Sequence, residues 1–582
     1  MKKKEEKRME KVKKILKNEN VTSILILFIC SFIVCIPLLN PKINIAYDDG
    51  IQHIARLMGT YQSITEGQSF PVIMSKFCNN FGYSWNLFYS PLTAYIPLIF
   101  KLLNFSFINC IKIFIFFVTF ISAITMYFFT FEVTKNKKIA VLSGIFYIFA
   151  PYRFTDMYLR NALAELTSFV FIPMIFQGLY GILKNKPKRE YIFIFGCAGL
   201  ILTHTVITLY TAILCAIYLL TQYRKIKDNK KIIIKLAIYI GVILAITSFF
   251  WMPLLEHRYS TNYEVFKPGR MERTEVLVAF KLSFSELFIT PPNNIMIFEI
   301  GILSTILLIL TPIVIKKIKT KYKNTDFYIF YKYSLITAII LLIMTLKIFP
   351  FEKLPSILKM IQFSFRLLEF TSFFISFIVA VNLEKLIKNL KYKDIAIITT
   401  ILIILSTTFI VHIHYENNIN EENLWPAVRV TKDTGRVHAG CASFEYLPCK
   451  AFENRKYIED REDKSIVLKG SAEIKNEQKE NTNLEFNLLN VTEETEIELP
   501  YIYYLGYDVK LESNNKNETL KTFETENGFV GIKVSNVENG NIKVKYTGTP
   551  IMHISRLISV IGVGLILFKI IVADRKMLHK VT

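Results

Sequence analysis

The sequence predicts a polytopic α-helical membrane protein of about 12 transmembrane helices, with an extracytoplasmic β-sandwich-like domain before the last helix. The 582 residues are 52% hydrophobic with a mean hydropathy of +0.35, too apolar for an ordinary soluble protein of this size. The apolar residues gather in runs of about 17–25, long enough to cross a bilayer. A late stretch alternates polar and apolar residues instead, as β-strands do.

The excess of basic residues indicates membrane topology. The formal net charge is +22, but the basic residues lie in short loops between the apolar runs. The positive-inside rule places these loops, and the Lys-rich residues 1–20, in the cytoplasm. A nucleic-acid partner is therefore not expected. The basic loops are 135–138, 184–189, 224–231, 316–323 and 385–393.

Spans laid between these loops put both termini in the cytoplasm. The first run, 21–40, is long for a signal peptide and lacks a small-residue cleavage site, so we interpret it as an uncleaved span. A full crossing by 87–103 would move the loop 135–138 outside, so we expect a re-entrant or interfacial helix there. The expected spans are 21–40, 107–131, 139–152, 163–183, 191–205, 207–222, 233–255, 295–316, 329–349, 361–383, 394–413 and 551–573.

This topology leaves four segments outside the cell: 41–86, 151–161, 256–294 and 415–550. The last segment has alternating patterns at 483–489, 494–499, 507–511, 529–534 and 541–546, with turn signals at Asn527-Gly528 and Asn539-Gly540. We interpret 475–483 as a polar linker. The predicted organisation is a basic tail over 1–20, a transmembrane domain over 21–414, a β-rich domain over 415–550, a last helix over 551–573 and a cytoplasmic tail over 574–582.

Cysteine and motif content narrow the chemistry. Cys441 and Cys449 lie in the same outer segment, where a disulfide between them is one alternative and two unpaired thiols the other. The sequence has no CxxC, HExxH, Walker A or GxGxxG pattern. No metal-ligand motif is therefore present, and nucleotide hydrolysis has no support.

The first outer segment carries a cluster of ionisable residues. Asp48 and Asp49 precede Gly50, and a helix starting there would place Asp49, His53 and Arg56 on one face. The paired carboxylates have three interpretations: a general base for a hydroxyl group, a site for a divalent cation, or a helix cap beside solvated neighbours.

A second outer segment, 151–161, adds Asp156 and Arg160, and Glu165 follows at the start of the next span. Ionisable residues at membrane depth are costly and usually face a polar cavity. The alternative is a structural ion pair between Asp156 and Arg160 at i,i+4 spacing.

Two further candidates lie in later apolar runs. Arg366 and Glu369 occur near the outer end of one span, where an arginine suits a phosphate group because it donates two hydrogen bonds at once. Alternatively, Arg366 extends to the interface. His204 lies between two apolar half-runs, where a packed, hydrogen-bonded histidine is the more common situation.

The chain as a whole resembles a bacterial membrane-protein family called 6-pyruvoyl-tetrahydropterin synthase-related, whose relatives include YfhO-type proteins. The residues 48–56 are similar to its DDxxxHxxR signature, and the resemblance continues in order through 66–71, 81–83, 88–91, 156–165, 361–366, 445–448 and 500–507. Ser364 departs from the family, where proline is common. Nothing in the chain resembles a soluble pterin enzyme.

Such proteins are similar to GT-C glycosyltransferases, which implies transfer of a sugar from a polyprenyl-phosphate carrier at the outer membrane face to an envelope glycan or lipid. The resemblance implies Asp49 or Asp48 as base, and Arg366, Arg160 and Arg56 as phosphate ligands. Asp156 and Glu165 would orient the arginines, and the β-rich domain would position the acceptor. His53 and, as a secondary candidate, His204 complete the expected donor-phosphate or substrate-binding set. A flippase of lipid-linked saccharides and a non-catalytic scaffold are the alternatives. The sequence leaves open a divalent cation between Asp48 and Asp49.

Overall fold

The computed structural model describes residues 19–291, 295–416, 441, 444–513 and 516–578. The chain forms two compact units. The first comprises the described residues of Met1–Gly50, Ile108–Ile243 and Glu272–Asn418, and the second those of Ile51–Phe107, Leu244–Met271 and Ile419–Thr582.

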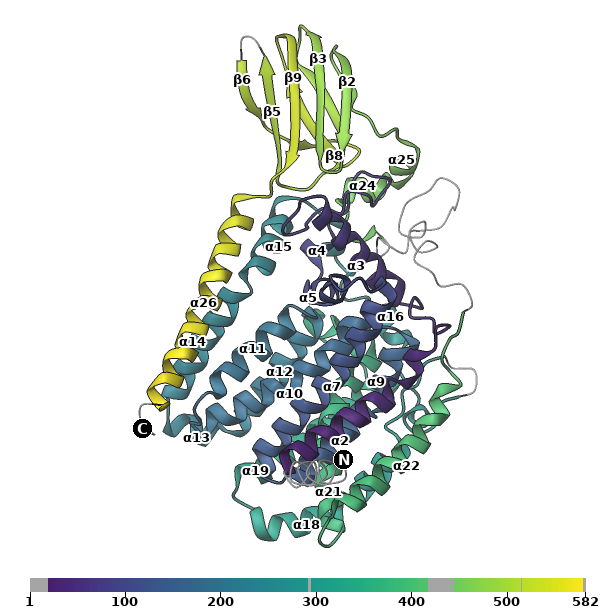
Figure 1. The fold of residues 1–582 in the computed structure, drawn as a ribbon, viewed down its shortest axis with the longest axis vertical. Helices are drawn as coiled ribbons and strands as arrows, with labels where there is room; N and C mark the ends of the chain where they lie inside the picture. The colour runs from purple at the N-terminus through teal and green to yellow at the C-terminus, as the bar shows by residue number, and fades with distance from the viewer. Residues whose placement is uncertain (1–18, 292–294, 417–440, 442–443, 514–515, 579–582) are drawn as a thin grey trace, which may run out of the picture. The chain divides into compact units, whose positions relative to one another are not determined.

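The first unit is helical (Figure 1). Its elements are α2 (Glu19–Val34), η1 (Ile36–Leu39), α7 (Phe107–Thr134), α8 (Lys137–Ile148), α9 (Pro151–Phe154), η2 (Thr155–Leu159), α10 (Leu163–Leu183), α11 (Arg189–Ile201), α12 (Thr205–Thr221), α13 (Tyr223–Asp228), α14 (Lys231–Ile246), α16 (Thr274–Ala279), η4 (Phe284–Leu287), α17 (Ile302–Ile309), α18 (Thr311–Tyr322), α19 (Asp326–Thr345), η5 (Phe351–Lys353), α20 (Ser356–Lys359), η6 (Ser364–Arg366), α21 (Leu367–Leu386) and α22 (Tyr392–Ile410).

Among the described residues, six helices are long and apolar enough to cross a membrane, or seven if a bent pair is one span. The six are Phe107–Thr134, Leu163–Leu183, Asp326–Thr345, Ser364–Leu386, Tyr392–Ile410 and Pro550–Val572, and the bent pair is Lys231–Ile246 with Ser248–Ser260, at 75°. The described chain therefore has several candidate membrane spans, but fewer helices meet these criteria than the expected twelve crossings.

Breaks and short helices account for the difference. The expected span 295–316 is divided into α17 and α18, because Pro312 in the first turn of α18 has no N–H for the preceding turn. The segment 87–103 contains one-turn helices that begin after Pro91 and Pro97, rather than one continuous helix. Glu19–Val34 and Thr205–Thr221 are apolar but shorter than the other spans.

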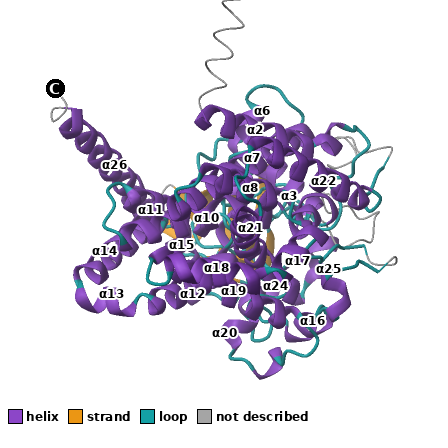
Figure 2. Ribbon diagram, turned by 90° about the horizontal axis from the view of Figure 1, so that it is seen from below, coloured by secondary structure: helices purple, strands orange, loops and turns teal. Residues whose placement is uncertain are grey.

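Helix α21 lies at the centre of the first unit. Figure 2 shows it among α8, α10 and α19, and nearly all of its residues are buried. Its aromatic side chains pack on those of neighbouring helices, with the ring of Phe373 4.9 Å from Phe129 and 5.1 Å from Phe176. A helix that is apolar on all sides belongs in such an interior position. The polar residues in its first turn are consequently held inside the bundle.

The second unit combines helices of different lengths with a β-sandwich. Its helices are α3 (Gly50–Thr65), α4 (Trp85–Phe88), α5 (Leu92–Tyr95), α6 (Leu98–Lys101), α15 (Ser248–Ser260), η3 (Glu264–Phe266), α24 (Cys449–Glu453), α25 (Arg455–Asp460) and α26 (Pro550–Leu578). Its strands are β1 (Ile466–Lys469), β2 (Glu473–Glu480), β3 (Asn483–Val491), β4 (Thr495–Ile502), β5 (Tyr507–Ser513), β6 (Lys516–Leu520), β7 (Phe523–Glu524), β8 (Phe529–Val534) and β9 (Val537–Tyr546).

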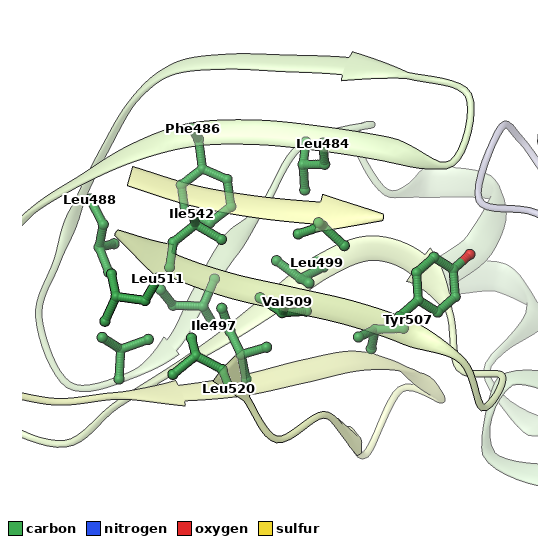
Figure 3. Packing of buried hydrophobic residues seen from close by; sticks show 14 of the residues in the cluster. Leu484, Phe486, Leu488, Ile497, Leu499, Tyr507, Val509, Leu511, Leu520 and Ile542 are labelled. Carbon is green, nitrogen blue, oxygen red and sulfur yellow. The ribbon is translucent and has the colours of Figure 1, made fainter. Parts of the chain in front are cut away.

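The strands form two antiparallel sheets, in the orders β1-β4-β8-β7 and β2-β3-β9-β5-β6. Apolar side chains from both sheets fill the space between them (Figure 3). The predicted β domain before the last helix is thereby confirmed. Two details of the prediction were wrong. The segment 475–483 is not a linker, because most of it belongs to the polar edge strand β2. Asn539-Gly540 is not a turn, because it lies within β9 and pairs with β3.

The sandwich core offers a test of the packing. Leu499 is fully buried between the sheets. Its replacement by alanine (Leu499→Ala) should destabilise the sandwich by about 2–5 kcal/mol, because lost burial and the remaining cavity both contribute. Hydrogen exchange of β4 and β8 in the full-length protein measures this loss. The control Lys545→Ala, on the exposed side of β9, should leave exchange nearly unchanged.

Candidate functional site

A π-helical turn positions Arg160. The turn η2 covers Thr155–Leu159, and the backbone N–H of Arg160 donates to the Thr155 carbonyl at 2.8 Å, five residues back. Single π turns inside helical segments are frequently found at functional sites. The chain then leaves the helix at Asn161, whose φ is +51°, and α10 begins at Leu163. The guanidinium of Arg160 is buried as a result.

Four carboxylates surround that guanidinium. Its Nη2 lies 3.0 Å from Asp49 Oδ2, and its Nη1 lies 3.0 Å from Asp156 Oδ1 and 2.9 Å from Glu165 Oε2. The Nε atom is 3.9 Å from Asp48 Oδ2. The backbone supports the arrangement, because the N–H of Asp49 donates to the Arg160 carbonyl at 3.0 Å. Segments 111 residues apart are thus joined by side chains and by main chain.

Glu165 also binds the second arginine of this unit. Nε of Arg366 donates to Glu165 Oε1 at 2.9 Å, and Nη2 lies 2.8 Å from the same oxygen. Nη1 of Arg366 donates to the Ile361 carbonyl at 2.8 Å and to Gln362 Oε1 at 2.9 Å. One buried carboxylate therefore bridges two guanidiniums. Glu165 lies in the first turn of α10, where the helix dipole favours negative charge.

Aromatic side chains enclose the cluster. The Arg160 guanidinium lies 5.2 Å from the ring centre of Phe365, and that of Arg366 lies 5.1 Å from Phe363. Tyr152 donates its hydroxyl hydrogen to Glu165 at 2.9 Å. These rings exclude water and strengthen the charge interactions.

Ser364 precedes Arg366 by two residues. Its hydroxyl donates to the carbonyl of Phe280 at 2.6 Å. A proline at this position would have no such donor.

Exposure increases from the interior toward the first loop. Asp156, Arg160, Glu165 and Arg366 are buried, whereas the side chains of Asp48 and Asp49 are 39% and 41% exposed. Deeper in the unit, the buried Glu369 accepts a hydrogen bond from Ser168. Within this cluster, the paired aspartates are the groups that a molecule in solution can reach.

The charges of the cluster balance when two carboxyls are neutral. Burial raises the pKa of Asp156 well above its usual range, and the Glu165 carboxylate adds to this effect. Burial and then the adjacent Asp49 carboxylate raise the pKa of Asp48 to about 6. With Asp156 protonated, Glu165 and Asp49 offset the positive charges of Arg160 and Arg366.

The loop that carries the aspartates is held at several points. The ring of Tyr47 stacks on His414 with centres 4.0 Å apart, and the N–H of Asn44 donates to the His414 carbonyl at 2.9 Å. Helix α3 then begins at Gly50, where a Cβ would overlap the carbonyl oxygen of Ile45. Only glycine fits this close approach.

Two of the other predicted residues, His53 and Arg56, occupy different surroundings, and the third, His204, has a structural role. His53 and Arg56 belong to the second unit, where Arg56 is buried, donates from Nε to Asn86 Oδ1 at 2.9 Å and from Nη2 to the Tyr89 carbonyl at 3.0 Å. The ring of His53 is 6.1 Å from that of Tyr89. His204 caps α12, with Nδ1 accepting from the Ile207 N–H at 3.4 Å, as a packed histidine would.

A divalent cation between Asp48 and Asp49 does not fit the arrangement. The Arg160 guanidinium already faces both carboxylates, at 3.9 and 3.0 Å. Across the residues with described positions, no group of three or more His, Cys, Asp or Glu side chains is arranged to hold a metal ion.

Arg153 was missed by the sequence analysis. It is fully buried in α9, donates to Thr119 Oγ1 at 3.1 Å and lies 4.8 Å from the ring centre of Phe169. Burial lowers its pKa to about 10. The sequence did contain a signal for Arg153, because it is a third charged residue, beside Asp156 and Arg160, in the short segment 151–161.

The bridging role of Glu165 can be tested by neutralising it. Glu165→Gln leaves two buried guanidiniums with no charge between them, so the free energy of unfolding should fall by about 3–5 kcal/mol. Thermal unfolding of the detergent-solubilised protein measures the change. Glu275→Gln, at an exposed position of the same unit, is the matched control, and an equal loss in both variants would contradict the bridge.

The pKa of Asp48 predicts a pH dependence of stability. Because this pKa is raised from 3.8 to about 6 in the folded protein, the folded state binds the proton more tightly than the unfolded chain. The resulting stabilisation is complete below the unfolded pKa and is lost as the pH rises through about 6.

Wild-type protein should therefore lose melting temperature relative to Asp48→Asn, which is always neutral, between about pH 4 and about pH 7. Thermal unfolding across this range measures the difference. A gain of wild type over the variant above the midpoint would show that Arg160 outweighs burial and Asp49.

Comparison with known proteins places the helical unit in a family. Residues 87–419, more than half of the chain, match the model of the 6-pyruvoyl-tetrahydropterin synthase related domain, described as a membrane protein. An uncharacterized protein of Lactococcus lactis subsp. cremoris (strain MG1363) is 27% identical over 228 residues, 38% of this chain and 37% of that relative. The match thus spans little more than a third of the relative's length. The matched range contains Asp156, Arg160, Glu165 and Arg366, and the chain belongs to the 6-pyruvoyl-tetrahydropterin synthase related family of membrane proteins.

Proposed function

We propose that this membrane protein is a GT-C-type, YfhO-like glycosyltransferase that transfers a sugar from a polyprenyl-phosphate donor to an envelope glycan or lipid. The observation that carries the proposal is the convergence of Asp48, Asp49 and Arg160 at one half-exposed site, which Glu165 joins to Arg366. Sugar transfer from a phosphate needs a base for the acceptor and cations for the leaving group.

The proposed reaction uses these groups in one displacement. The acceptor hydroxyl oxygen attacks the anomeric carbon while its proton passes to Asp49. The bond between that carbon and the phosphate oxygen breaks, and the polyprenyl phosphate leaves with the electron pair. Arg160 stabilises the negative charge that develops on the leaving oxygen.

The buried residues have positioning roles in this proposal. Both Nη atoms of Arg160 and the Nε and Nη1 atoms of Arg366 already donate to protein groups, so Glu165 and Asp156 fix the orientation of the guanidiniums. The donor phosphate would bind at the edge of Arg160 where Asp48 and Asp49 now lie. The phosphate would thereby displace these carboxylates from the guanidinium.

The proposed topology places the reaction at the outer face, with cytoplasmic termini and an extracytoplasmic β-sandwich that positions the acceptor. The lysine-rich loops support this orientation through the positive-inside rule. A twelve-crossing GT-C-like arrangement is part of the same proposal.

Substitution at the aspartates tests the mechanism. Purified protein in liposomes, supplied with radiolabelled polyprenyl-phosphate sugar and an envelope extract as acceptor, should transfer label. Asp49→Asn should lower kcat about 10²–10⁴-fold, the usual contribution of a general base. Asp228→Asn, at an exposed site on α13, should retain full activity.

Other outcomes distinguish the alternatives. Movement of the labelled donor across the bilayer without transfer would identify a flippase, and neither activity would favour a scaffold. Full transfer by Asp49→Asn together with loss in Asp48→Asn would assign the base to Asp48. Full transfer by both variants would remove the pair from the mechanism.

A further inference from the structure

Two cysteines of the second unit, far apart in sequence, are in contact. Cys78 Sγ lies 3.6 Å from Cys441 Sγ, across 363 residues of chain. Both side chains are fully buried. Sulfur atoms at this separation touch, and side-chain rotation can bring such a pair to the disulfide bond length of about 2.05 Å.

An unusual turn directs Cys78 to this position. Cys78, Asn79 and Asn80 have φ values of +50°, +57° and +68°, a left-handed conformation that costs energy for a residue with a side chain. Surrounding groups hold the turn: Asn79 Nδ2 donates to the Ile458 carbonyl at 3.2 Å, and Lys479 Nζ donates to the Asn80 carbonyl at 2.7 Å. A conformation of this kind persists when its neighbours fix it.

Tyr83 fixes the other cysteine. Its hydroxyl donates to the Cys441 carbonyl at 2.7 Å and accepts from the Tyr446 N–H at 3.1 Å. The hydroxyl of Tyr504 donates to the Tyr446 carbonyl at 3.0 Å. These buried tyrosines join the loop of Cys78 to the segment that precedes the sandwich, so the two thiols meet in a preformed environment.

We propose that Cys78 and Cys441 form a disulfide that links this loop to the segment before the β-sandwich. Two thiols are oxidised, and an S–S bond replaces two S–H bonds. The two electrons and two protons pass to the disulfide of a thiol oxidoreductase, which becomes a dithiol. The bond forms during folding, while the thiols are still accessible.

Burial supports this order of events. It raises the pKa of the Cys78 thiol well above its usual range, so little thiolate, the reactive form, exists once the loop has closed. The same burial then protects the finished bond from reductants. The partner of Cys441 in this proposal is Cys78, because the two Sγ atoms are 3.6 Å apart. It therefore differs from Cys449, the alternative that the sequence suggested, which lies at the start of helix α24.

Peptide mapping of the full-length protein tests the proposal. Cells expressing the protein are treated with N-ethylmaleimide before lysis, and the purified protein is digested without reductant. A cross-linked peptide pair containing Cys78 and Cys441 is expected, and the Cys449→Ser variant should retain it. Alkylation of both thiols in wild type, or a link from Cys441 to Cys449, would overturn the proposal.

A stability readout accompanies the map. Reductant should lower the unfolding temperature of the wild type and of Cys449→Ser, but not that of Cys78→Ser, which has no bond to lose. An equal response of all three proteins to reductant would contradict the disulfide. Should Cys78→Ser fail to fold, the wild-type map alone decides, because it needs no variant.

Discussion

The helical unit depends on one buried carboxylate that serves two guanidiniums. Glu165 contacts Arg160 and Arg366 at 2.9 and 2.8 Å, with little water nearby to solvate any of the three. Removing such charges from water costs several kcal/mol per ion, so the cluster is tolerated only with near-ideal geometry and further hydrogen bonds. The hydroxyl of Tyr152 and the carbonyl of Ile361 supply those bonds.

This requirement fixes several elements at once. The π turn must direct Arg160 inward, α10 must begin where its first turn presents Glu165, and η6 must present Arg366 at the start of α21. A shift of any of them would leave a buried charge unpaired, which is far more costly than a shift of an apolar contact. Ionic geometry therefore sets where the π turn ends and where α10 and α21 begin within the bundle.

The sequence contained much of this site but not its shape. Asp156, Arg160 and Glu165 were predicted as a group because they lie where a span emerges or begins, and the i,i+4 spacing of Asp156 and Arg160 also suggested an ion pair. Hydropathy cannot reveal a π turn, which adds one residue to a turn without changing composition. Hydropathy also cannot show that Arg366 binds the Glu165 carboxylate, 201 residues away in the chain, because such contacts depend on tertiary packing.

In the β domain, too, some strands were predictable from the sequence and others were not. Strand β8 was predicted with its observed bounds, because apolar and β-branched residues make a buried strand recognisable. Strand β2 was missed because it is an edge strand with mostly exposed, charged side chains, as edge strands commonly are. Asn539-Gly540 has the composition of a hairpin turn, yet pairing with β3 on one side and β5 on the other keeps it extended.

Both Nη atoms of Arg160 already donate hydrogen bonds to carboxylates, and this has a consequence for the proposed reaction. A phosphate placed beside the intact cluster would add negative charge next to Asp49 and Glu165, and low dielectric makes that repulsion severe. Replacement of Asp49 by the phosphate keeps the charge balance, and a phosphate with two oxygens at the Nε and Nη2 edge of Arg160 could accept two hydrogen bonds, which suits arginine. Once displaced from the guanidinium, the Asp49 carboxylate can accept a hydrogen bond from the acceptor hydroxyl instead. In the proposed reaction, binding of the donor phosphate to Arg160 and release of the Asp49 carboxylate therefore occur in the same step. The phosphate takes the place of Asp49 at the partly exposed edge of a guanidinium that Glu165 and Asp156 hold in position.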